Sequence, residues 1–150
     1  MQSEFAESTD VTIGVSVKLP YENSIHSEEL FDQLTVIDAN NDKSTWTFDS
    51  GYEAATYKYN AENAGDDWLV SPAVNMKKNA AYKFSFDAVN TYPVERVAAA
   101  VGLAPTAEAL TEEIIAPTDI TYDPRRHTLT GTYRAKEDGL HYFGIPVSYT

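Results

Sequence analysis

Two stretches of sequence decide how we interpret this chain: VIDANNDKSTW at residues 36–46 and GDDWLVSP at residues 65–72. Each combines apolar residues that favour burial with a group of oxygen-bearing side chains. The protein's two tryptophans, Trp46 and Trp68, each follow one of these acidic groups. Because tryptophan buries a large area and anchors packed sheets, we expect both to be core residues rather than platforms for a ligand.

The first stretch is a candidate metal loop. Asp38, Asn40 and Asp42 alternate, so a curled loop could direct all three side chains to one point, as a hard cation such as Ca²⁺ requires. The spacing matches half of an EF-hand loop, but Lys43 occupies the glycine position and no helices are expected on either side. We therefore predict a looser structural calcium site that also uses Asp67. The alternative is an Asx-rich turn whose side chains bond to backbone amides.

Alternating apolar and polar residues predict short antiparallel strands along most of the chain. These lie at residues 11–19, 35–37, 45–48, 55–59, 67–70, 82–89, 95–103, 127–133 and 139–147. Helix signals are confined to residues 27–34 and 106–113. Many strands with only one or two helical turns predict an all-β fold, a two-sheet antiparallel β-sandwich. We expect residues 1–10 to be a flexible segment and residues 11–150 to form a single domain.

Several of these segments together resemble a known family. The matching stretches are LPYE at 19–22, LTVID at 34–38 with the acidic loop and Trp46, DWLVSP at 67–72, AAAVG at 98–102 with TAEAL at 106–110, and GLHYFGI at 139–145. In this order they resemble the cleaved-adhesin family, the jelly-roll modules of gingipain-type haemagglutinins and of many secreted Bacteroidota proteins. The resemblance covers roughly residues 19–148. It departs from the family pattern at Asp67, where the family usually has asparagine.

The resemblance implies a jelly-roll sandwich and a function. Such a domain would be a non-catalytic, extracellular module of a larger secreted or surface-attached bacterial protein, acting in adhesion beside neighbouring domains of the same polypeptide. The partner would be a host protein or a glycan. Two alternatives remain open: a purely structural spacer, and an accessory module of a carbohydrate-active enzyme.

Tyrosines are the candidate ligand-binding residues. Tyr52, Tyr57, Tyr59 and Tyr92 lie in or beside predicted loops, where aromatic rings next to polar groups can hold sugars. The alternative is that these rings are half-buried on sheet faces with only their hydroxyls in water.

Composition excludes some classes of function. The net charge of −12 argues against nucleic acid as a partner, and no cysteine is available for disulfides or thiolate metal sites. No apolar run approaches the roughly 18 residues of a membrane helix, so we expect no membrane insertion. His26, His127 and His141 are not spaced as metal ligands, and no nucleophile motif is present, so we expect no enzyme activity. The first residues lack signal-peptide features, so if the natural protein is exported, we expect its signal to have been removed.

Overall fold

The computed structural model describes residues 16–39, 41, 45–57 and 66–148, and within them the chain is almost entirely β-structure. The elements are α1 (Glu28–Phe31), β1 (Thr35–Asp38), β2 (Thr47–Asp49), β3 (Ala54–Thr56), β4 (Asp66–Val70), β5 (Val74–Met76), β6 (Ala81–Gly102), β7 (Glu112–Arg134) and β8 (Gly139–Ser148). The strand pairs are all antiparallel. The all-β class predicted from the sequence is confirmed.

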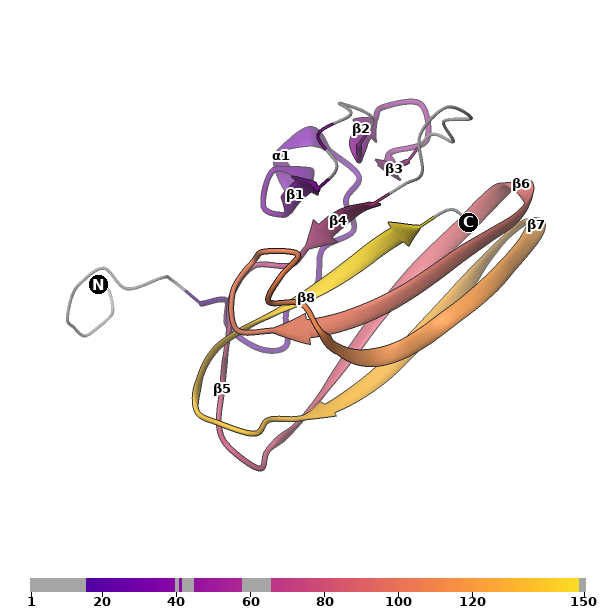
Figure 1. Cartoon of the computed structure of the whole chain (residues 1–150). Coiled ribbons are helices and arrows are strands. Elements are labelled where there is room, and N and C mark those ends of the chain that lie inside the picture. The colour runs from indigo at the N-terminus through magenta and orange to yellow at the C-terminus, as the bar shows by residue number, and fades with distance from the viewer. Residues whose placement is uncertain (1–15, 40, 42–44, 58–65, 149–150) are drawn as a thin grey trace.

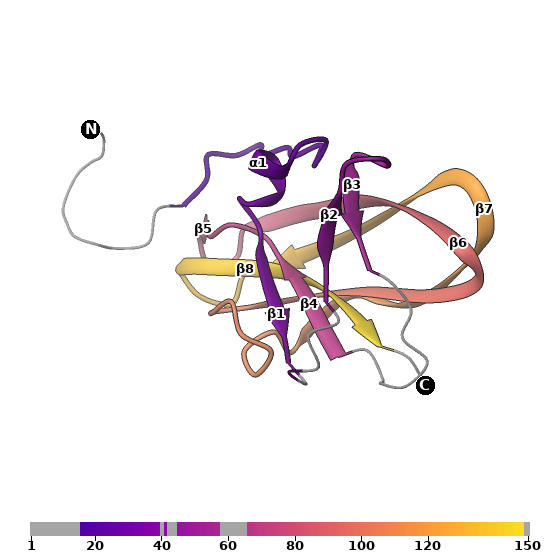
Figure 2. The same ribbon diagram turned by 90° about the horizontal axis from the view of Figure 1, so that it is seen from above.

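The main sheet has the strand order β1-β4-β8-β6-β7, and β5 pairs with β8 at one end. Strands β2 and β3 form a separate two-stranded hairpin. Figure 1 shows this hairpin together with α1 at the top of the molecule, and Figure 2 shows the same elements from above. Strands that are far apart in the sequence are neighbours in the sheet, for example β4 and β8, as in a sandwich rather than a simple meander.

Two layers arise because the long β6–β7 hairpin bends back over the main sheet. Its pairing shifts register between Ala88 and Asn90 and again between Asn90 and Val94, and irregularities of this kind bend a strand. Beyond the bend, only residues 97–102 of β6 pair with β8. Before the bend, Phe84 of β6 stacks on Phe143 of β8, with ring centroids 4.7 Å apart and planes at 9°. The hairpin therefore contributes to both layers of the sandwich (Figure 1).

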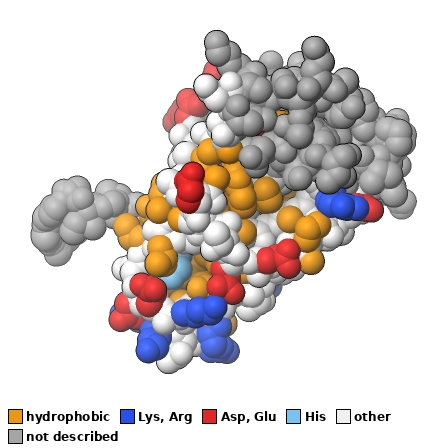
Figure 3. Space-filling view, in the orientation of Figure 1, with side chains coloured by type: hydrophobic (Ala, Val, Ile, Leu, Met, Phe, Trp, Pro, Cys, Tyr) orange, Lys and Arg blue, Asp and Glu red, His pale blue; other side chains and the backbone are white. Residues whose placement is uncertain are grey.

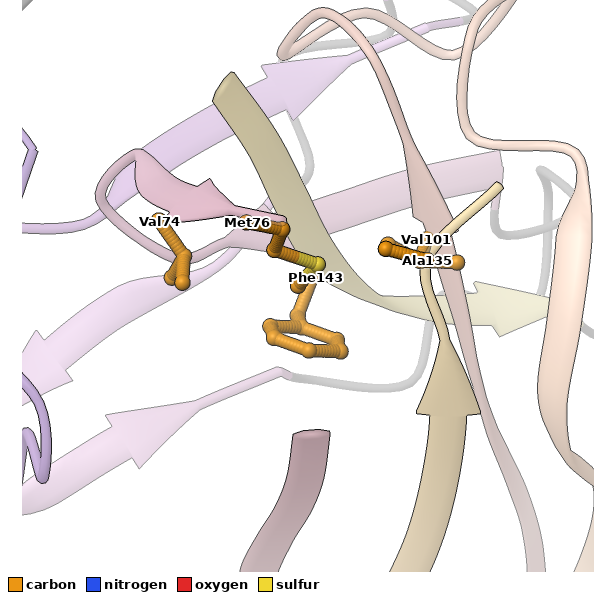
Figure 4. Close-up of a cluster of buried hydrophobic side chains, with 5 residues drawn as sticks. All are labelled: Val74, Met76, Val101, Ala135 and Phe143. Carbon is orange, nitrogen blue, oxygen red and sulfur yellow. The ribbon is translucent and has the colours of Figure 1, made fainter. Parts of the chain in front are cut away.

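The core fills the space between these layers. Figure 4 shows its buried centre, which consists of Val74, Met76, Val101, Ala135 and Phe143. A second buried cluster, made of Ala99, Ile115, Ile120 and Leu129, lies along the bent hairpin. The layers approach closely at Gly131, where an added Cβ would lie 2.6 Å from the carbonyl oxygen of Ile114. Position 131 therefore requires glycine so that the two halves of β7 can pack against each other.

The opposite face of the main sheet carries a smaller apolar cluster. Val70, Ala100 and Leu110 are its buried members, and Ile37, Trp68 and Tyr142 pack against them. The turn at residues 103–111 folds onto this face, because a Cβ on Gly102 would lie 2.1 Å from the carbonyl oxygen of Ala109.

Three local predictions were wrong. The helix predicted at residues 106–113 is absent: the turn at 103–111 includes amides of Ala109 and Leu110 that both donate to the Thr106 carbonyl, and β7 begins at Glu112, which pairs with Val101. Residues 16–19 are not a strand; one amide, that of Val17, donates to the Ala73 carbonyl. The rest of the predicted strand, residues 11–15, and the predicted flexible segment, residues 1–10, lie outside the described residues. The short strands predicted at residues 82–89, 95–103 and 127–133 are parts of two long strands, β6 and β7.

Candidate functional site

The end of β1 brings two acidic residues together. In the antiparallel register Asp38 of β1 lies opposite Asp67 of β4, one pair beyond Ile37 and Trp68. Side chains of such directly opposed residues lie about 4.5–5.5 Å apart at Cβ. Asp67 is fully buried, with 0% of its surface exposed, and Asp38 is half-buried. Two carboxylates in this arrangement repel each other unless a proton, a donor group or a cation lies between them.

The other predicted metal ligands, Asn40 and Asp42, lie outside the described residues. Among the residues that the structure describes, no group of three or more His, Asp or Glu side chains gathers in a way that could hold a metal ion. Of the four predicted ligands, the register therefore places Asp38 opposite Asp67. The calcium site itself stays a prediction.

The β2–β3 hairpin presents an exposed aromatic ring. Asp49 closes its turn, because Oδ1 of this residue accepts hydrogen bonds from the amides of Gly51 at 2.8 Å and Tyr52 at 3.1 Å. This is an Asx-type turn, which fixes the backbone at the tip of the hairpin. Tyr52 is 72% exposed, the highest value among the exposed large hydrophobic side chains of the described residues. The hairpin therefore holds an amphipathic ring in solvent on an ordered backbone.

The base of the same hairpin is closed by two aromatic residues. Trp46 precedes β2 and Tyr57 follows β3, and their rings meet edge to face with centroids 5.7 Å apart. Both side chains are half-buried. Tyr57 is therefore committed in part to packing, whereas Tyr52 is not. Trp68 is half-buried against the Val70, Ala100 and Leu110 cluster, which fits its expected packing role.

The remaining predicted ligand-binding tyrosines cannot be placed beside these two. Tyr59 lies outside the described residues. Tyr92 belongs to β6, in the irregular stretch between Asn90 and Val94, and not to the β2–β3 hairpin.

A ring contact joins the hairpin to α1. Phe31 of α1 packs against Phe48 of β2, with ring centroids 6.3 Å apart. The helix begins at Ser27, whose side chain caps the amide of Leu30, as the serine followed by two acidic residues predicted. Sequence reasoning missed Phe31, Phe48 and Asp49 as supports of the site. Of these, Asp49 could have been found from the Asp-Ser-Gly turn signal.

The histidines lie in different parts of the fold. His141 of β8 is 1% exposed; its Nδ1 lies 2.9 Å from the Gly139 carbonyl oxygen, and its ring packs near Tyr133. This residue packs in the interior of the domain. His127 lies in β7 and His26 precedes α1.

Two surface ion pairs shift the pKa values of their side chains. Arg96 and Asp119 lie 2.8 Å apart across β6 and β7, and the hydrogen bond lowers the pKa of the Asp119 carboxyl and raises that of Arg96. Lys136 donates to Glu112 at 2.8 Å, and this hydrogen bond raises the pKa of the Lys136 ammonium group. Both pairs are solvent-exposed, so they contribute little to stability.

Comparison with known proteins identifies the fold. No protein-family model and no curated protein matches the sequence. Among solved structures, the K1 cleaved adhesin domain of Lys-gingipain from Porphyromonas gingivalis W83 matches with a TM-score of 0.57 and 17% identity, over 79% of this chain and 82% of that chain. The K3 cleaved adhesin domain of the same protein gives a TM-score of 0.56 and 16% identity, over 79% and 83%.

The chain has the fold of the cleaved adhesin domains, a jelly-roll β-sandwich, and the resemblance seen in the sequence is confirmed at the level of fold. No helix among the described residues is long and apolar enough to cross a membrane.

Proposed function

We propose that this chain is a non-catalytic, adhesin-like binding module of a larger secreted or surface-attached bacterial protein, and that it binds a host protein or a glycan. The observation that carries the proposal is Tyr52. The Tyr52 ring is 72% exposed, so a partner can cover it without removing packing from the domain. Asp49 fixes the backbone of this turn, so little conformational entropy is lost on binding. The fold shared with adhesin domains supports the same proposal.

The binding surface would be centred on the tip of the β2–β3 hairpin. The Phe31–Phe48 contact joins the hairpin to α1, and the Trp46–Tyr57 contact closes its base. Loops displayed on a rigid sandwich are a common way for such domains to bind. Tyr57 would contribute from the base of the hairpin, and Tyr59 and Tyr92 stay predicted contributors.

A glycan array and a panel of extracellular-matrix proteins test the proposal. We expect saturable binding to at least one of them, and a loss of about tenfold or more when Tyr52→Ala removes the ring, as for a central aromatic contact. The matched control is Leu103→Ala, which removes an apolar side chain that is 52% exposed in a different turn. Equal loss in both variants, or no binding by the wild type, would refute the proposal. The second outcome would favour the spacer function.

We further propose that Ca²⁺ stabilises the loop after β1, with Asp38, Asn40, Asp42 and Asp67 as its ligands. The opposed carboxylates of Asp38 and Asp67 support this, because a divalent cation would remove their repulsion. We expect millimolar Ca²⁺ to raise the melting temperature relative to a chelator, and Asp67→Asn to reduce the increase. An unchanged melting temperature with Ca²⁺ would exclude the site.

A further inference from the structure

One end of the sandwich is built from two turns that are joined by backbone hydrogen bonds. The β5–β6 turn and the β7–β8 turn exchange bonds from the Asn79 amide to the Ala135 carbonyl at 2.8 Å and from the Ala135 amide to the Ala80 carbonyl at 3.0 Å. The Lys78 backbone amide donates a hydrogen bond of 2.7 Å to the Asp138 carboxylate, and the Arg134 side chain donates one to the Asn79 carbonyl. Residues 77–83 and 132–138 therefore form one structural unit, the basic end.

The charge of this end is opposite to that of the protein. Its 14 residues include five basic residues, which are Lys77, Lys78, Lys83, Arg134 and Lys136, and two acidic residues, Glu137 and Asp138. Its net charge is therefore +3. The rest of the chain has the remaining six basic and 21 acidic residues, a net charge of −15, since the whole chain carries 11 and 23. Figure 3 shows the Lys and Arg side chains gathered at the bottom of the molecule, with acidic side chains beside them.

Most of these cations are available for a partner. All five side chains are exposed. Among the residues that the structure describes, Lys136 is the member of the basic end that takes part in a salt bridge, with Glu112. Lys77, Lys78 and Lys83 belong to none of the described ion pairs. Like charges that gather repel one another, so no stabilising ion pair explains this concentration of lysines.

A row of hydroxyl groups leads away from the basic end. Along the hairpin, Tyr82, Phe84 and Phe86 are turned toward the core, which leaves the alternate positions on the outer face. The exposed side chains are Lys83, Ser85, Asp87, Arg126, Thr128, Thr130, Thr132 and Arg134. Ser85 and Thr130 hydroxyls lie 2.9 Å apart, and the Thr128 hydroxyl donates to Asp87 at 2.7 Å. At about 3.4 Å per residue, the strip from Arg126 to Arg134 is about 27 Å long.

We propose that this basic end and the adjoining hydroxyl strip bind an anionic polysaccharide, one that carries sulfate or carboxylate groups. Lys77, Lys78, Lys83 and Arg134 would contact the charged groups. The hydroxyls of Ser85, Thr130 and Thr132 would exchange hydrogen bonds with sugar hydroxyls, since each can donate and accept. In Figure 1 the β2–β3 hairpin that carries Tyr52 lies at the top of the molecule, and the turns of the basic end lie at the bottom.

A polysaccharide fits this surface better than a lipid membrane. The strip is extended, polar and free of exposed aromatic rings among its described side chains, whereas peripheral membrane binding combines cations with inserted apolar side chains. A polymer with regularly spaced anions can contact the basic end and continue along the strip, which a single head group cannot.

Binding of dextran sulfate and of uncharged dextran, measured by calorimetry, tests the proposal. We expect the protein to bind dextran sulfate, to bind dextran far more weakly, and to lose affinity as salt increases. The triple variant Lys77→Gln/Lys78→Gln/Lys83→Gln should lose about tenfold or more, because three exposed charges no longer contribute. Arg96→Gln is the control for loss of a cation elsewhere, and Tyr52→Ala is the control for the proposed adhesin surface. Both should bind dextran sulfate as the wild type does.

A hydroxyl substitution and two other polyanions test whether the ligand must be a sugar. Thr130→Val removes one hydroxyl and keeps a β-branched side chain, so it should weaken binding to dextran sulfate while circular dichroism and melting temperature stay at wild-type values. Equal binding to polyglutamate or to vesicles rich in phosphatidylserine would overturn the assignment of a polysaccharide. Unchanged affinity of the triple variant would overturn the assignment of the site. Either result would leave the Tyr52 proposal standing, because Tyr52 is tested with a different variant.

Discussion

Replacing Gly131 by alanine tests how closely the two halves of β7 pack. An added Cβ would lie 2.6 Å from the Ile114 carbonyl oxygen and 2.8 Å from Cγ1 of Ile115. The first atom belongs to the backbone of a paired strand and cannot rotate away. Overpacking of this kind costs about 1–3 kcal/mol, and we expect the upper half of that range because backbone must move.

The same substitution brings a smaller gain. Alanine has fewer unfolded conformations than glycine, which stabilises a protein by about 0.4–1 kcal/mol where no strain arises. The net loss should be about 1–2.6 kcal/mol. For a domain of 150 residues this lowers the melting temperature by about 2–10 °C.

Calorimetry or urea unfolding of Gly131→Ala measures this loss. Gly51→Ala is the matched control, since its nearest neighbour would be a side-chain oxygen of Asp49 at 3.1 Å in an exposed turn. We expect the control to change stability by less than half as much. If Gly131→Ala were as stable as the wild type, the halves of β7 would not lie against each other, and the bent hairpin would be wrong.

Three further predictions concern other parts of the domain. Gly102→Ala should destabilise more than Gly131→Ala, because its Cβ would lie 2.1 Å from the Ala109 carbonyl oxygen; urea unfolding of the two variants side by side checks the order. Phe31→Ala should speed amide hydrogen exchange in β2 and β3 while leaving exchange in β8 unchanged, because the Phe31–Phe48 contact holds the hairpin. Equal protection of β2 and β3 in Phe31→Ala and in the wild type would contradict this. The Asp119 carboxyl should titrate below the ordinary value for aspartate, so its small stabilising effect is present at neutral pH and disappears as pH falls through that lowered pKa; NMR should show Arg96→Gln moving the pKa upward, and a pKa that does not move would refute the pairing.

Strand positions could be predicted where the hydrophobic period was clear. In residues 82–88 every second side chain is apolar, and these side chains do face the core. The sequence predicted Asp67 as a further ligand beside the acidic loop, and the register that sets it opposite Asp38 comes from the structure. The tyrosines were found as loop residues, and among the described ones it is the fold that separates exposed Tyr52 from packed Tyr57.

Other features depend on contacts that a sequence period does not show. The segment Thr-Ala-Glu-Ala-Leu at 106–110 favours a helix locally, but packing against Gly102 and the start of β7 at Glu112 hold it as a turn. The bulges near Asn90 join what the pattern predicts as separate short strands into β6 and β7. The basic end is formed by two turns more than 50 residues apart, since Lys78 contacts Asp138 with a separation of 60 residues, so its charge was not visible as a run.

The two-layer sandwich, with the β6–β7 hairpin folded over the main sheet, positions every surface to which a function is assigned above. Phe84 and Phe143 report on it most directly, because they come from different layers and stack at 4.7 Å. Nuclear Overhauser effects between the ring protons of these two residues should be strong in the folded protein. Their absence, with both rings assigned, would contradict the sandwich.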